Sequence, residues 1–396
     1  MKRNAEVEMR SRAALIDEVT KAEPVLYTAI DVGPGQWSVV LTDGNGELRS
    51  KTIEAGNFEQ LEEEIDRAAR YFELGEDYTV ACCHEVGRDG FWIHRALEQR
   101  AMISVLIDPG SLREKKKKRR AKTDRVDAEK IASEFVRWCD GHREHTVDIV
   151  RVPSPEDEDE RHLFREHDDL VGDKTSLGNT IEGLLKTQGI EEYPPPGDEE
   201  LFEAWLEEAT TGDGRPLGRH LKRRLRRLAE RLRGVLDQIR ELEDEWEAYL
   251  DGEGREEVIG KVKLLNSLRG LGVKTSLAFV VEMYGWREFQ NRREIGAYVG
   301  MDGERCDSGT NDQDRPITRQ GNTRIRTLTV QMARCWLRWQ PDSELTEWAR
   351  RRFSGADGTV SHKGVVALGR KLLNRFRVYL NGGPAPNGAR FSRPDI

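Results

Sequence analysis

The sequence contains no long apolar run. None of its 396 residues lies in a stretch of about 18 consecutive apolar positions, the length that spans a bilayer as a helix. The N-terminal segment lacks the apolar core and the small-residue cleavage site of a secretion signal. We therefore expect neither membrane insertion nor export, and a cytoplasmic location.

Cysteine is also scarce, and it is spaced without a metal-binding or disulfide pattern. The five cysteines include no CxxC pair, and their number is odd. This argues against a disulfide framework and against a zinc knuckle, and it fits a reducing compartment. The five are Cys82, Cys83, Cys139, Cys306 and Cys335.

An overall positive charge is lacking, but the charges are segregated. The net charge is −8, which argues against a protein that coats nucleic acid uniformly. However, residues 113–125 carry nine Lys or Arg against two acids, and arginine recurs from Arg315 to Arg377. Acids gather instead in residues 155–160 and 198–208. Such segregation gives a polyanion a place to bind, although a lysine run is more often a solvated loop.

The first half of the chain has the pattern of a mixed α/β sheet. The length predicts two or three domains, each able to bury its own core. Three short strands joined by turns precede alternating helices and strands, which is the order of an RNase H-like fold with helices on both faces. The expected strands are 25–30, 37–42, 47–53, 78–83 and 103–107, and the expected helices are 57–72 and 90–99.

The middle of the chain has the pattern of long helices. Residues 156–188 are helical and charged, and the prolines of 193–197 predict a hinge or linker. Apolar residues then alternate at spacings of three and four for four heptads, which favours a coiled coil. It could be a hairpin within one chain or a contact between subunits. The heptad positions are Leu221, Leu225, Leu228, Leu232, Val235, Ile239, Leu242, Trp246 and Tyr249.

The last third is predicted to be mainly helical, with a long polar loop. Gly270 and Gly272 bracket a leucine between helical stretches, either as a phosphate-binding element or as a plain turn. Residues 300–321 are too long and too rich in glycine for a simple connector. We expect a charged extension (1–22), an α/β domain (23–150), a helical coiled-coil region (151–258), a C-terminal domain (259–380) and a loose tail (381–396).

Four carboxylates occupy informative places in the first domain. Asp31 ends the first strand and Glu85 follows the strand YTVACC, and in an RNase H-like sheet these strands are neighbours. Asp124 and Asp127 are three apart at a helix start and therefore share a face. Taken singly, each is more often a cap or a surface charge. Together, four acids would repel one another unless divalent cations neutralised them, which points to Mg²⁺ or Mn²⁺ and to phosphoryl transfer.

These residues also carry a family resemblance. The strings AIDVG, HEVGRDG and RRAKTDRVDAEKIA, then LRGLGVKTSLAFVVEMYGWREFQNRREIGAYVGM, CDSGT, RPITRQGNTRIRTLTVQMA and KGVVALGRKLL resemble the DEDD transposases of the bacterial insertion-sequence family one-hundred-and-ten. The resemblance covers residues 25–380. Members of this family are recombinases guided by a bridge RNA.

The resemblance implies roles for individual residues. Asp31, Glu85, Asp124 and Asp127 would be the metal-binding DEDD set of a RuvC-like domain, and Ser308 of CDSGT would be the nucleophilic serine that forms a phosphoserine link with DNA. From the residues alone, an SG pair is a plain turn. Basic side chains would contact nucleic acid: Lys115, Lys116, Lys117, Lys118, Arg119, Arg120, Lys122, Arg315, Arg319, Arg324 and Arg326. The last four could also simply lie on a solvated helix face.

The resemblance further implies the partners, which are donor and target DNA and a noncoding bridge RNA, in the cytoplasm of a bacterium or archaeon in association with the nucleoid. The heptads, together with the need to bring two DNA duplexes together, predict a homodimer or homotetramer. The sequence departs from the family pattern at Gly300, because the proline that is usual after this glycine is missing. His84 could contact the metal site, but a lone histidine at the end of a strand is more often structural. Two alternatives stay open, namely a RuvC-like endonuclease that uses metal-activated water and an inactive relative that only binds nucleic acid.

Overall fold

The structure is a computed structural model of the chain. It describes residues 24–108, 124–142, 147, 149–289, 291–302, 317 and 321–392, without the side chains of 124–127 and 253. The chain divides into two compact units, one up to Ser154 and one from Pro155. In the described part of the chain, no helix is long and apolar enough to cross a membrane.

The first unit is built on a six-stranded mixed sheet with the strand order β3-β2-β1-β4-β5-β6. Strands β1, β2 and β3 form an antiparallel meander, β4 and β5 run parallel to β1, and β6 is antiparallel to β5. This confirms the predicted mixed sheet. The elements are β1 (Val25–Val32), β2 (Gln36–Thr42), β3 (Arg49–Glu54), α2 (Phe58–Tyr71), β4 (Thr79–Glu85), α3 (Gly90–Glu98), β5 (Ile103–Ile107), α4 (Asp124–Cys139) and β6 (Ile149–Val150).

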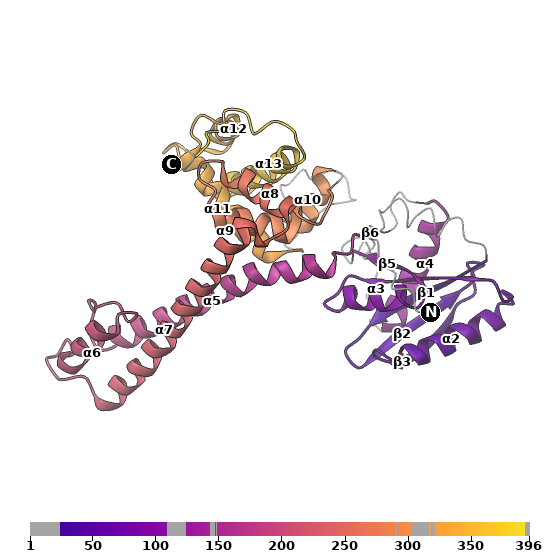
Figure 1. Cartoon of the computed structure of the whole chain (residues 1–396), viewed down its shortest axis with the longest axis horizontal. Helices are drawn as coiled ribbons and strands as arrows, with labels where there is room; N and C mark the ends of the chain where they lie inside the picture. The colour runs from indigo at the N-terminus through magenta and orange to yellow at the C-terminus, as the bar shows by residue number, and fades with distance from the viewer. Residues whose placement is uncertain are drawn as a thin grey trace. The chain divides into compact units, whose positions relative to one another are not determined.

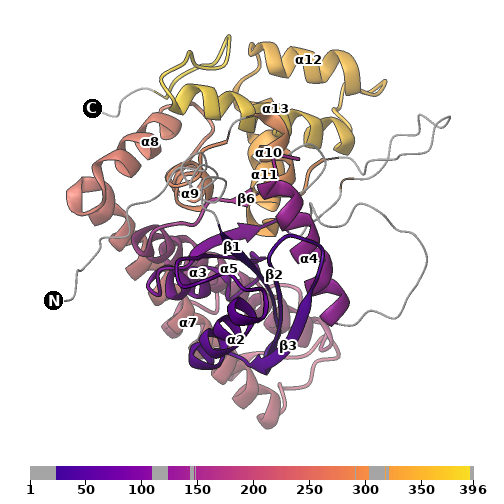
Figure 2. The same ribbon diagram turned by 90° about the vertical axis from the view of Figure 1, so that its right-hand side faces the viewer.

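Helices cover both faces of this sheet. Side chains alternate between the faces of a strand, so each face has its own core. Leu26 and Ile30 of β1 pack with α2 and α3, whereas Ala29 packs with α4. Figure 2 shows α4 on one side of the strands and α2 on the other. The helices cover the two faces of the sheet, and the ends of β1 and β4 lie side by side at one end of it.

The second unit is helical, and a long hairpin extends from its core. Helices α5 and α7 run antiparallel, with α6 at the far end of the pair (Figure 1). The remaining helices pack around Trp336 and Phe376. The elements are α5 (Pro155–Lys186), α6 (Glu199–Glu208), α7 (Arg219–Ala248), η2 (Tyr249–Glu253), α8 (Glu256–Asn266), α9 (Val273–Phe279), η3 (Val280–Tyr284), α10 (Arg292–Val299), α11 (Thr323–Trp339), α12 (Glu344–Phe353) and α13 (His362–Leu380).

The heptad positions of α7 face α5 of the same chain. At the base of the hairpin, Trp246 donates from Nε1 to the carbonyl oxygen of Leu163 (3.2 Å). The ring of His167 lies 4.4 Å from that of Trp246, and its Nε2 is 3.2 Å from Glu243. The repeat therefore serves a hairpin within one chain, and a coiled coil between subunits stays a prediction.

The segment after α13 is docked rather than loose. Gln340 is fully buried, and its amide donates to the carbonyl oxygens of Arg269 and Arg390, each at 2.8 Å. The backbone N–H of Ser392 donates to Ser267 (2.7 Å). The expectation of a loose tail was wrong for residues 381–392, because the buried side chain of Gln340 finds its partners in their backbone.

Candidate functional site

Asp31 and Glu85 lie at the same level, at or next to the ends of two neighbouring parallel strands. Ile30 of β1 pairs with His84 of β4, and the two acids are the next residues along these strands. Alternation places them on the face of Ala29 and Cys83, which α4 covers. Both side chains are partly exposed. The two carboxylates that the sequence predicted to converge therefore share one edge and one face of the sheet.

Helix α4 runs antiparallel to β1 and begins near this edge. In its second turn, Glu129 accepts a hydrogen bond from Ser50 (3.1 Å), which lies level with the middle of β1. Further along, the ring of Phe135 packs edge-on against Tyr27, near the start of β1 (6.0 Å between centroids). The first turn of α4 therefore lies toward the end of β1 that carries Asp31.

That first turn contains the other two predicted acids. α4 begins at Asp124, and Asp127 follows within one turn. Their backbone is described and their side chains are not. Among the described side chains, no group of three or more His, Cys, Asp or Glu is placed to hold a metal ion. The two described carboxylates offer hard oxygen donors, which suit a divalent cation such as Mg²⁺.

His84 is not part of this edge. It belongs to the opposite face of the sheet, next to Gly90 at the start of α3, and it is fully buried. Burial lowers the pKa of His84 to about 4, so its ring is neutral at ordinary pH. Burial likewise raises the pKa of the Cys82 thiol to about 12. Neither group is suited to act in chemistry at the Asp31–Glu85 edge.

Several predicted site residues lie outside the described residues. These are the nucleophile candidate Ser308, with Cys306 beside it, and most of the predicted basic contacts. The latter are Lys115, Lys116, Lys117, Lys118, Arg119, Arg120, Lys122, Arg315 and Arg319.

The two ends of the segment that contains Ser308 meet at a buried acid, Glu282. Glu282 lies in η3, and its side chain is completely buried. It accepts two hydrogen bonds from the guanidinium of Arg165 (2.6 and 3.0 Å) and one from the Asn322 amide (3.0 Å). Its backbone carbonyl accepts from the Tyr298 hydroxyl (2.6 Å). One acid thus connects α5, the end of α10 and the start of α11.

The backbone reinforces this junction. The N–H of Asn322 donates to the carbonyl oxygen of Tyr298 (2.8 Å), and the Asn322 side chain caps α11 by accepting from Ile325 (3.1 Å). Gly321 has a φ of +112°, and a Cβ there would lie 2.3 Å from the Tyr298 oxygen. Only glycine fits this close approach without strain.

Arg324 and Arg326 already have partners within the chain. Arg324 forms ion pairs with Asp168 (2.8 Å) and Asp169 (2.6 Å) of α5. Arg326 donates to the carbonyl oxygen of Val299 (3.1 Å) and to Thr323. In this conformation the two guanidinium groups connect α11 to α5 and α10, and neither is an open phosphate clamp.

The sequence reasoning missed Glu282 and its partners. The available signal was a single acid within the apolar stretch AFVVEMYGW, where a charge must find a buried partner. Its partners Arg165 and Asn322 are far from it in sequence. The local pattern therefore indicates that a partner exists without indicating which residue it is.

Comparison with known proteins places these features in a family. A family model described as a transposase, of the DEDD type named for IS110, matches residues 28–189. A second, described as the IS116/IS110/IS902 family transposase, matches residues 262–346. A putative transposase of Sinorhizobium fredii, y4rJ, is 33% identical over 385 residues, which are 93% of this chain and 95% of that protein.

Two further relatives are more distant. A probable family 20 transposase of Pseudomonas aeruginosa is 25% identical over 55% of this chain and 60% of its own length. The transposase for insertion sequence element IS1111A of Coxiella burnetii is 27% identical over 55% of each chain.

Proposed function

Because this chain belongs to the IS110 family of insertion-sequence transposases, we propose that it cleaves and rejoins DNA strands through a phosphoserine link made by Ser308. The observation that carries the proposal is the edge of the sheet where Asp31 and Glu85 lie side by side, toward which the first turn of α4 is directed. Metal-dependent phosphoryl transfer uses such a concentration of carboxylates to hold its cations.

We propose that Asp31, Glu85, Asp124 and Asp127 together hold divalent cations, Mg²⁺ or Mn²⁺. When bound, such cations polarise the scissile phosphate and stabilise the leaving oxygen. The position of Asp31 and Glu85 favours this use, because it brings two hard oxygen donors, which divalent cations prefer, to one edge of the sheet. The role of the chain is to hold these oxygens at fixed positions on rigid strands and at a helix start.

Ser308 supplies the nucleophile in this proposal. Its Oγ attacks the scissile phosphorus, a phosphoserine bond forms, the bond from phosphorus to the leaving sugar oxygen breaks, and that oxygen takes a proton. Attack by the hydroxyl of the incoming strand then releases the serine. Tyr298 and Asn322, which precede and follow Ser308 in the sequence, are both anchored at Glu282.

We further propose that target choice rests on a noncoding bridge RNA, and that the active assembly is a homodimer or homotetramer. The family resemblance supports the RNA. The assembly follows from the need to bring two DNA duplexes together. The serine and the acids could come from one subunit or from two.

The experiment is recombination between donor and target plasmids with Mg²⁺, in the presence and absence of RNA transcribed from the flanks of the gene. Denaturing gels of the reaction would detect a protein–DNA adduct. We expect recombination only with RNA and Mg²⁺, and an adduct with the wild type that Ser308→Ala abolishes. Cleavage that survives Ser308→Ala without an adduct would instead establish the water-using endonuclease. Absence of cleavage with every substrate would favour the inactive binding protein.

A further inference from the structure

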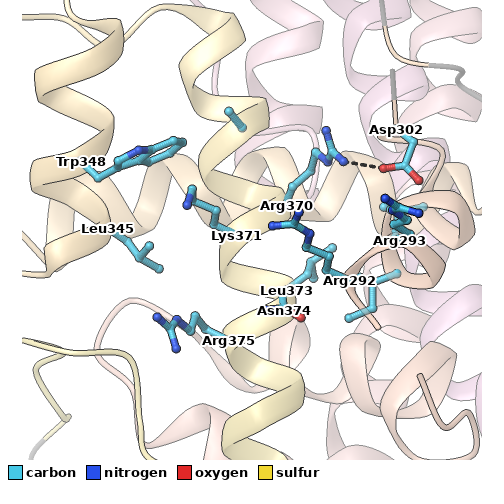
Figure 3. Close-up of a pocket in the computed structure, with 14 residues that line it drawn as sticks. Arg292, Arg293, Asp302, Leu345, Trp348, Arg370, Lys371, Leu373, Asn374 and Arg375 are labelled. Carbon is cyan, nitrogen blue, oxygen red and sulfur yellow. Dashed lines mark hydrogen bonds and ion pairs between the residues drawn. The ribbon is translucent and has the colours of Figure 1, made fainter. Parts of the chain in front are cut away.

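A large pocket opens between three helices of the second unit. Its volume is about 880 Å³, and it lies between α10, α12 and α13. Figure 3 shows its lining, with Trp348 on one side and Asp302 on the other. A pocket of this size is in the range of those that enclose small ligands. None of its residues belongs to the Asp31–Glu85 edge.

The rim of the pocket is strongly basic. Among the described residues that line it, five are cationic and one, Asp302, is acidic, and Asp302 pairs with Arg370. The other four cations are exposed, and none of them forms an ion pair with a described carboxylate. Unmatched positive charge in a concave site raises the local concentration of anions. The five cations are Arg292, Arg293, Arg370, Lys371 and Arg375.

The floor of the pocket is apolar. Ile295, Val299, Leu345 and Leu373 contribute to it, and the Lys371 ammonium lies 4.4 Å above the Trp348 ring. A free phosphate would use only the cations. A duplex presents mainly phosphates and sugars at its surface, so it would also leave this floor unused. An unpaired nucleotide matches both, because it has a phosphate for the rim and a base for an apolar surface.

The position of the pocket along the chain favours DNA as the source of that nucleotide. Asp302 lines the pocket and precedes Ser308 by six residues, which can span at most about 22 Å of extended chain. We propose that this pocket binds an unpaired stretch of the DNA strand that Ser308 attacks, a few nucleotides from the scissile phosphate. This inference rests on the proposed function of Ser308.

The test uses the full chain with Ser308→Ala in every variant, so that binding is measured without covalent capture. The probe is fluorescein-labelled oligothymidylate, and fluorescence anisotropy gives its affinity across a salt series. The pocket variant combines Arg292→Gln, Arg293→Gln and Arg375→Gln. The matched control combines Arg223→Gln, Arg224→Gln and Arg227→Gln, three exposed arginines of α7 outside the pocket lining and outside the arginine-rich stretch 315–377. A lysine version of the pocket variant keeps the charge.

We expect the pocket variant to weaken binding about tenfold or more and to reduce the slope of log affinity against log salt by about 2. The control and the lysine version should stay within about threefold of the parent. An equal loss in the control, or a loss for oligouridylate RNA without one for DNA, would overturn the proposal. If the adduct assay fails while the pocket variant still loses DNA binding, the serine chemistry is refuted and the pocket is not. If the adduct forms and the pocket variant binds normally, the pocket alone is refuted.

Discussion

Tyr298 and Asn322 are 24 positions apart in the chain, yet the backbone N–H of Asn322 donates directly to the Tyr298 carbonyl oxygen at 2.8 Å. Both residues also bond to Glu282. These bonds join the end of α10 to the start of α11 beside Glu282. The strength of this junction therefore depends on a few identifiable bonds.

The first prediction concerns Glu282. Replacing it by Ala leaves the Arg165 guanidinium without its bidentate partner and removes a hydrogen bond from Asn322. Because Arg165 is partly exposed, we expect a loss of about 2 kcal/mol in the free energy of unfolding rather than the larger loss of a fully buried pair. Urea denaturation would measure it, with Glu347→Ala on exposed α12 as the control. An equal effect of the two substitutions would contradict the anchoring role.

The second prediction separates steric clash from backbone strain at Gly321. Gly321→Ala adds a Cβ that would meet the Tyr298 oxygen, at a positive φ. Gly214 has a positive φ of 82° and open space around it, so Gly214→Ala introduces strain alone. We expect a loss of about 1 kcal/mol at Gly214 and at least about 2 kcal/mol at Gly321. Thermal unfolding would measure both losses of stability. Similar losses would show that the close approach to Tyr298 does not contribute to the effect at Gly321.

The third prediction concerns the carboxylates at the end of the sheet. Asp31→Asn and Glu85→Gln should each reduce strand cleavage by about 10²-fold or more, because each removes a charged oxygen donor. Added Mg²⁺ should stabilise the wild type but not the double variant. A melting temperature that rises equally with Mg²⁺ in both would exclude this edge as the metal site.

The fourth prediction concerns pH and the α5–α7 hairpin. Burial lowers the pKa of His167, and the nearby Glu243 only partly offsets this. The unfolded state therefore binds a proton more readily, so stability is full above pH 6.5 and falls as the pH drops through the ordinary histidine pKa. Denaturant unfolding between pH 8 and pH 5 would measure the decline. His167→Gln should make this decline shallower, and an unchanged slope would rule His167 out as its cause.

Much of the first unit could be predicted from the sequence because its signals are local. Strand β5 matches its predicted range, and β1 and β4 each end two residues later than predicted, so that they include Asp31 and Glu85. Strand β6 was not predicted, because its two residues are too few to show the alternation of side chains that marks a strand. The convergence of Asp31 and Glu85 followed from the expected strand order, which pairing in the sheet bears out.

The second unit was less predictable because its key contacts are distant in sequence. The heptads of α7 indicated a helix with an apolar seam, but they could not choose between α5 and another subunit as its partner. The sequence predicted Arg324 to be a phosphate ligand, but in the structure it forms ion pairs with Asp168 and Asp169 of α5. The basic pocket could not be predicted from the sequence either, because the residues that line it come from three separate helices, α10, α12 and α13.

The pairing of Ile30 with His84 has a consequence for how this protein can lose activity. Because side chains alternate along a strand, a slip of β1 by a single residue would send Asp31 to the opposite face and bring Val32 beside Glu85. The same slip would exchange the core positions of Leu26, Ala29 and Ile30 between the two faces, so that the strand register fixes the packing of the sheet and the position of Asp31 together. The alignment of these two strands thus determines whether Asp31 and Glu85 lie beside each other at all.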